Sequence, residues 1–252
     1  MAFDGGTVLL QWAVGGLAFC WFTTRRQVLG IGYGWLLRSV WGLCALGGLF
    51  VGLRTDIVPV REASAAGVVL ATGVALIVSI RRKADGPEAL PTWLDLPAPI
   101  IGVVGLVAAG VAAGGPDALA VARVLVGAAF LGAITDAMLL GHWYLVQPGL
   151  SRDPLNELLT VSTVLWFPEV VVLLWPVGMV SVLNGTIDDG YGGMLGWFWV
   201  MSAVTTIGLL VVTRLALREK QYSAVMAATG LLYLAILTAA GTDLVARALL
   251  AS

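Results

Sequence analysis

Eight long apolar runs divide this chain, and charged residues or turn residues such as glycine and proline separate them. An α-helix needs about 20 apolar residues to cross the hydrocarbon core of a bilayer, which is roughly the length of each run. We therefore expect an all-α integral membrane protein. It is a polytopic bundle of about eight transmembrane helices, with no soluble domain and a single transmembrane domain over residues 1–252. The predicted spans lie near 6–24, 29–53, 63–80, 98–115, 118–146, 158–183, 194–215 and 222–248.

The number of spans depends on the fourth run, which is short, rich in alanine and glycine, and followed by a Gly-Gly-Pro-Asp turn at 114–117. Merging or losing this run would leave seven helices. With eight, most basic residues lie on one side of the membrane and only Arg54 and Arg61 occupy opposite loops. The positive-inside rule then favours eight spans in a bacterial-type plasma (inner) membrane, with both termini on the non-cytoplasmic side.

Composition strengthens this interpretation. Apolar residues make up 59% of the chain and charged residues 12%, whereas soluble domains carry about 25% charged residues. The predicted partner is the lipid bilayer. The net charge of −1 argues against binding to nucleic acid, which needs concentrated positive charge. The first run has no basic region before it and is expected to be a retained helix, and Cys20 and Cys44 read as buried thiols within spans.

Several ionisable residues fall inside the apolar runs, where a charge costs roughly 2.5–3.5 kcal/mol on insertion scales. Counting inward from the predicted cytoplasmic ends places Arg38, Asp136 and Glu169 each about 15 Å deep, in one layer. Arg38 could then hold both carboxylates ionised in a structural network that fixes helix register. The alternative is a proton, ion or substrate pathway, in which an unpaired carboxyl group carries a proton and Arg38 holds or gates the acids.

The sixth predicted span offers a second indication of a site. Pro168 precedes Glu169 and removes one backbone hydrogen bond, and Pro176 follows in the same run. Broken helices at membrane depth persist where protein or a water-filled cavity satisfies the exposed backbone. The segment from Trp166 to Pro176 is therefore predicted to line a pathway, although an ordinary packing kink explains the prolines equally well. Tyr233 is a secondary candidate for the lining.

His142 is the only histidine of the chain and lies near the predicted cytoplasmic end of its span. It could relay protons towards Asp136, contact a quinone or lipid head group, or simply hydrogen-bond an interfacial loop. A lone histidine does not make a metal site, so none is predicted. On the opposite side, we expect Arg123, Asp243 and Arg247 to form an outer cluster, either functional or a modest structural bridge.

The connection 84–97 carries three prolines around Trp93 and Asp95 and is predicted to form a short strap at the cytoplasmic interface. No phosphate-binding loop, nucleophile elbow or zinc-protease motif is present, so no catalytic residue and no cofactor are assigned.

The favoured hypothesis is a protein that moves protons, or a small solute coupled to them, through a polar layer. The alternative is a membrane subunit of a respiratory or redox complex, in contact with other protein subunits and contributing a quinone pocket, a proton path or a structural contact. An intramembrane enzyme is the third possibility.

Overall fold

The computed structural model describes residues 4–82, 91–114, 117–176 and 178–250, and every regular element within these ranges is a helix. Eight of the described helices are long and apolar enough to cross a membrane, which confirms the predicted all-α membrane bundle. Two further helices are short: η3 (Thr92–Asp95) and α7 (Met179–Leu183). The eight long helices are α1 (Gly5–Thr24), α2 (Ile31–Gly52), α3 (Pro59–Arg81), α4 (Pro97–Ala112), α5 (Asp117–Val146), α6 (Asp153–Leu174), α8 (Met194–Ala216) and α9 (Tyr222–Leu249).

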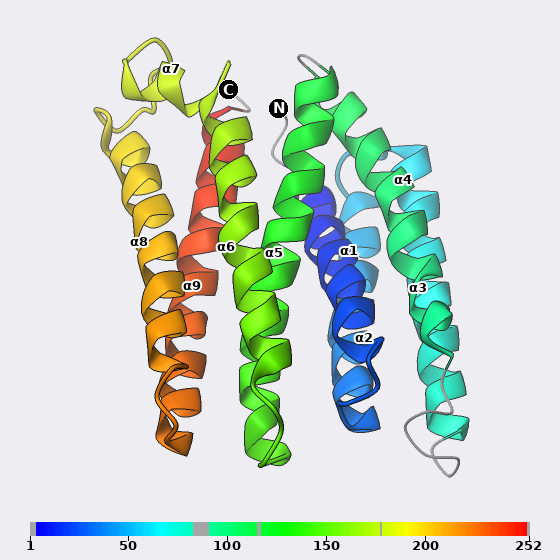
Figure 1. The fold of residues 1–252 in the computed structure, drawn as a ribbon. Coiled ribbons are helices and arrows are strands. Elements are labelled where there is room, and N and C mark those ends of the chain that lie inside the picture. Colours follow the sequence, from blue (N-terminus) through cyan, green and yellow to red (C-terminus); the bar gives the residue numbers. More distant parts are fainter. Residues whose placement is uncertain (1–3, 83–90, 115–116, 177, 251–252) are drawn as a thin grey trace.

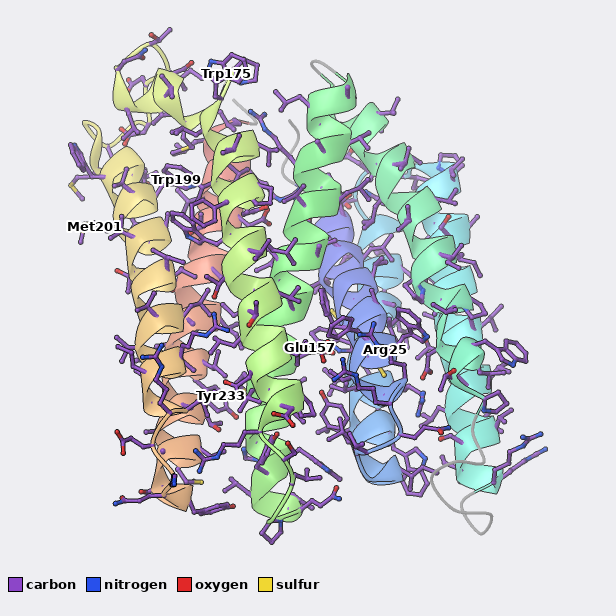
Figure 2. All side chains as sticks on the ribbon, viewed as in Figure 1. Arg25, Glu157, Trp175, Trp199, Met201 and Tyr233 are labelled. Atoms are coloured by element: carbon purple, nitrogen blue, oxygen red, sulfur yellow. The ribbon has the colours of Figure 1, made fainter. Side chains whose placement is uncertain are left out.

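The long helices run up and down, so the bundle has two ends with different chemistry (Figure 1). The end that holds both chain termini and α7 is called the terminal end here. The opposite end holds the α1–α2, α5–α6 and α8–α9 turns and is called the basic end. Its arginines include Arg25, Arg26, Arg152 and Arg218. At this end Arg25 and Arg26 both contact Glu157 of α6, at 3.4 and 2.9 Å, and Figure 2 shows Arg25 beside Glu157.

Helices α1 and α5 form the middle of the bundle. Helix α1 contacts α2, α4 and α5, while α5 contacts α1, α4, α6 and α9. Helices α2, α3 and α4 therefore lie on one side of the α1–α5 pair, and α6, α8 and α9 lie on the other (Figure 1). On α8, Trp199 points into the bundle and Met201 away from it, with exposed fractions of 3% and 60% (Figure 2).

Two helix boundaries differ from the predicted spans in ways that affect the site. Helix α6 ends at Leu174 and not at 183, because Trp175 is extended and Pro176 cannot continue a helix. Helix α6 also begins at Asp153, five residues before the predicted start, since Pro154 suits a first helical turn. These two changes together move Glu169 towards the terminal end of its helix.

The backbones of α1 and α5 touch. A Cβ atom placed on Gly15 would lie 1.8 Å from the carbonyl oxygen of Ala128, and one on Gly132 would lie 2.2 Å from the carbonyl carbon of Gly15. Small residues allow this approach, as is common between membrane helices. The next residue, Gly16, faces the other way and receives the indole ring of Trp41 from α2, which a Cβ atom would meet at 2.0 Å.

A carboxylate caps helix α8 at the terminal end. Both oxygens of Asp189 accept backbone N–H groups: Oδ1 from Tyr191 and Gly193 at 3.0 and 2.8 Å, and Oδ2 from Leu195 and Gly196 at 2.8 and 3.4 Å. The loop can turn this tightly because Gly193 adopts a φ of 89°. These hydrogen bonds hold the pKa of Asp189 below its ordinary value, the bond from Gly193 contributing most.

Replacing Gly15 by leucine is expected to destabilise the bundle by about 1–3 kcal/mol or more, because the side chain has no space between α1 and α5. The matched control is Gly208→Leu on α8, where an added Cβ meets nothing within 4 Å. Unfolding of both variants in mixed detergent micelles measures the difference. Equal stability of the two variants would contradict the close α1–α5 contact.

Replacing Asp189 by asparagine should loosen the start of α8, because an amide nitrogen cannot accept the N–H groups that one carboxylate oxygen accepts now. A lowered pKa means that the capping contribution is present above the pKa of the unfolded chain, about 3.9, and is lost as the pH falls through the lower folded value. Hydrogen exchange at residues 191–196 checks both statements. Protection that is the same in the wild type and the variant would refute the cap.

Candidate functional site

Arg38 of α2 forms a buried bidentate ion pair with Asp95 of η3. Its Nε donates to Oδ1 at 2.7 Å and its Nη2 to Oδ2 at 2.6 Å, and the two residues are 2% and 6% exposed. Thr24 Oγ1 adds a longer contact of 3.3 Å to the same carboxylate. Gly34 makes room for the guanidinium, since a Cβ atom there would lie 2.6 Å from Arg38 Nη1. The pair thus ties α2 to η3, and Thr24 joins α1 to the same carboxylate.

This pairing corrects the predicted layer, in which Arg38 lies between Asp136 and Glu169. The structure describes only residues 91–97 of the predicted strap over 84–97, and the rest lies outside the described residues. In this part η3 contacts α1, α3 and α4 and carries the Asp95 side chain into the bundle. A fork-shaped guanidinium that already binds one carboxylate through two parallel bonds is satisfied by it. Arg38 therefore neutralises Asp95, and neither of the two predicted acids contacts it within hydrogen-bond distance.

Asp136 of α5 is fully buried. Its Oδ1 accepts a hydrogen bond of 2.9 Å from the indole N–H of Trp41, and its Oδ2 has no partner among the described residues. Asp136 lies ten residues before Val146, about 15 Å from the basic end, as predicted. Tyr33 and Cys20 are buried close enough to interact with it electrostatically. Within the described part of the chain, Asp136 thus has one neutral donor and no cation in hydrogen-bond contact, and we call Asp136 with Trp41 the inner site.

Glu169 of α6 lies at a different depth. It is 16 residues from Asp153, about 24 Å from the basic end, and only five residues from Leu174. The prediction of one shared layer is therefore wrong, because α6 begins earlier than its apolar run. Glu169 is fully buried, and neither of its carboxyl oxygens has a hydrogen-bond partner among the described residues. Its electrostatic neighbours are Asp243 and Arg247 of α9, so it adjoins the predicted outer cluster.

The outer cluster joins α1, α5 and α9 near the terminal end. Arg247 Nε donates to Asp243 Oδ2 at 2.8 Å, and Arg247 Nη2 also donates to Gln11 Oε1 of α1. Gln11 Nε2 donates to Asp243 Oδ2 at 3.4 Å. Gly127 of α5 leaves room for this meeting, because a Cβ atom there would lie 2.4 Å from Gln11 Nε2. Arg123 interacts electrostatically with Arg247, and its Nε donates to a backbone carbonyl oxygen of α6 at 2.7 Å.

Two small cavities adjoin these clusters from opposite ends. At the terminal end, a cavity of about 60 Å³ has Arg247 in its wall together with Asp4, Asp56 and Arg61. Arg61 is itself paired with Asp4 and Glu62. At the basic end, a cavity of about 30 Å³ is bordered by Arg38, Asp95 and residues of the α1–α2 turn. Both volumes, and the charged side chains in each wall, suit water molecules. Water can therefore approach each cluster from its own side of the bundle.

The remaining predicted pathway residues lie elsewhere. Tyr233 is 48% exposed on α9, so its predicted place in an internal lining is wrong. His142 is exposed while Asp136 is fully buried, and the structure does not bring the two together. Trp166 donates its indole N–H to the carbonyl oxygen of Ala203 at 2.9 Å, which ties α6 to α8. Helix α6 continues through Pro168, so the proline does not break it.

Sequence reasoning missed Trp41, Gln11 and Glu62, and it gave Asp95 and Arg61 no role in a site. Gln11 is a polar side chain in a largely apolar run, a signal that could have marked it. Trp41 is one of ten tryptophans and had no signal that set it apart. The partners of Asp95 and Arg61 depend on how a connection folds back and had no local signal. No protein-family model, characterised protein or solved structure matches this chain. The geometry of the buried charges is therefore what any proposal must use.

Replacing Arg38 alone by methionine should cost about 3–5 kcal/mol of stability, because it leaves Asp95 buried and unpaired. The double variant Arg38→Met with Asp95→Leu should recover most of this loss. Unfolding in mixed micelles gives the coupling energy. The control is Arg25→Met, which removes a partly exposed pair and should cost about 0–1 kcal/mol. A double variant no more stable than Arg38→Met would show that the pair is not the reason for the loss.

Proposed function

We propose that this chain conducts protons across the membrane, or couples their movement to a small solute, with Asp136 and Glu169 as the groups that bind and release them. The observation that carries the proposal is a pair of fully buried carboxyl groups with unpartnered oxygens, on the neighbouring helices α5 and α6. Intramembrane acids of this kind are costly to keep and mark proton relays in many pumps and transporters.

The state of the buried cations supports this choice of residues. Asp95 satisfies Arg38, while Asp243 and Gln11 satisfy Arg247. Among the described residues, Asp136 has only the neutral indole of Trp41 as a hydrogen-bond donor. An ionised carboxylate without a cation in an apolar core costs several kcal/mol, whereas the protonated acid is tolerated there. Transient hydration of such a group therefore couples directly to uptake or release of a proton.

Asp136 and Glu169 lie at different depths in the bundle. Glu169 lies about 9 Å further from the basic end than Asp136, judged from their positions along α6 and α5. That separation exceeds one hydrogen bond, so proton transfer between them requires intervening water or a rearrangement of α5 against α6. The cavity at the terminal end has Arg247, an electrostatic neighbour of Glu169, in its wall, and the cavity at the basic end is bordered by Arg38 and Asp95.

The distribution of arginines between the two ends of the bundle gives the direction of the proposed pathway. We place the basic end in the cytoplasm of a bacterial-type cell and both termini outside it, since arginines concentrate at the α1–α2, α5–α6 and α8–α9 turns. Protons would then reach Glu169 from the outer face and leave Asp136 towards the cytoplasm.

The test is proton flux in vesicles that contain the purified chain, driven by a pH gradient and a membrane potential. Asp136→Asn and Glu169→Gln preserve side-chain shape and remove the exchangeable proton. Each should reduce flux at least about a hundredfold, the lower range for loss of a proton-transfer group. Glu157→Gln, which lies on α6 at the basic end and is partly exposed, is the control that should keep its flux. Unchanged flux in both buried-acid variants would refute the proposal.

A further inference from the structure

A groove on the outside of the bundle separates α2 from α3. It has a volume of about 320 Å³, and the residues flanking it are exposed and apolar: Leu43 and Leu46 on α2, and Val74 and Ile77 on α3. Surfaces of this kind on membrane helices face lipid chains. Its lining includes Arg38 and Gly42 of α2 and Val69, Thr72, Gly73 and Leu76 of α3.

Two glycines make the groove. Gly42 allows α2 to approach Thr72, since a Cβ atom there would lie 3.3 Å from the Thr72 methyl carbon and close the floor. Gly73 leaves the opposite wall open, because an added Cβ would meet nothing within 4 Å. Arg38 contributes no charge to the surface, as it is 2% exposed and turned towards Asp95. The cleft is therefore suited to a hydrocarbon chain rather than to a polar solute.

The depth of the groove in the membrane indicates which kind of molecule could place a hydrocarbon chain in it. Leu76 lies five residues before the end of α3 at Arg81, about 8 Å along the helix axis, and Val69 lies about 18 Å from the same end. The groove thus begins just inside the basic end and reaches the middle of a hydrocarbon core about 30 Å thick. That range is the depth of acyl chains from one leaflet.

The end of α3 supplies the matching charge. Arg81 and Arg82 are exposed at the end of α3, about 8 Å beyond Leu76 along the helix axis. Basic residues at a helix end attract anionic head groups, with about 1 kcal/mol for each residue near the surface. We infer that the α2–α3 groove binds one anionic phospholipid of the leaflet at the basic end, with an acyl chain against Gly42 and Gly73 and the phosphate at Arg81 and Arg82.

This inference is independent of proton transport and can be tested with the whole chain. The protein is reconstituted in vesicles of equal amounts of phosphatidylglycerol and phosphatidylcholine, extracted in mild detergent, and examined by native mass spectrometry for retained lipid. The wild type should retain one phosphatidylglycerol. Gly73→Leu fills the groove and should lose that lipid, while the control Gly208→Leu, also at an open glycine, should keep it.

A second pair of variants tests the head group. Arg81→Gln with Arg82→Gln should lower the preference for phosphatidylglycerol over phosphatidylcholine by about fivefold for each arginine. The control Arg218→Gln with Lys220→Gln changes the same charge at the same end of the bundle and should leave the preference unchanged. Three results would overturn the inference: equal retention of both lipids by the wild type, equal retention by Gly73→Leu and Gly208→Leu, or an unchanged preference for phosphatidylglycerol in the Arg81→Gln, Arg82→Gln variant.

Discussion

The contact between the backbones of α1 and α5 at Gly15 and Gly132 is the constraint on which the rest of the structure depends. With α1 pressed against α5, Gln11 passes Gly127 and reaches Asp243 on α9, on the far side of α5. On its other face α1 receives Trp41 of α2, which places the indole N–H at Asp136. A wider separation of the two helices would remove both polar contacts. The same glycine contacts thus hold the bundle together and position the inner site and the outer cluster.

The distribution of buried charge follows a simple rule. In a solvent that cannot hydrate ions, each buried cation needs an acceptor, and the buried arginines have them. Arg38 binds Asp95, Arg61 binds Asp4 and Glu62, and Arg247 binds Asp243 and Gln11.

Once these pairs are formed, two fully buried acids remain without a cation in hydrogen-bond contact among the described residues, Asp136 and Glu169. Stability explains the pairs, but it does not explain why two unpaired acids are kept. That excess of acid over base is what the proposed proton pathway accounts for.

The fold was predictable from sequence because the membrane dictates it: each span needs a minimum apolar length, and basic residues mark one end. Burial of Arg38, Asp136 and Glu169 followed from the same apolar runs. Their partners did not, since Asp95 reaches Arg38 from a short helix that has no apolar period of its own. The predicted depth of Glu169 was wrong because α6 begins at Asp153, in polar sequence that lies outside the apolar run. The hydrophobic pattern of the sequence does not predict contacts between distant helices, such as Gln11 with Asp243, because these depend on how the helices pack.

The central claim is that Asp136 and Glu169 exchange protons within the membrane, and infrared difference spectroscopy of the reconstituted chain tests it most directly. The carbonyl stretch of a protonated carboxyl group is distinct from that of a carboxylate and reports the state of each acid. The account predicts two buried carboxyl signals that change with the pH of the medium, one absent in Asp136→Asn and the other absent in Glu169→Gln. Spectra in which neither variant removes a pH-dependent carboxyl signal would contradict it.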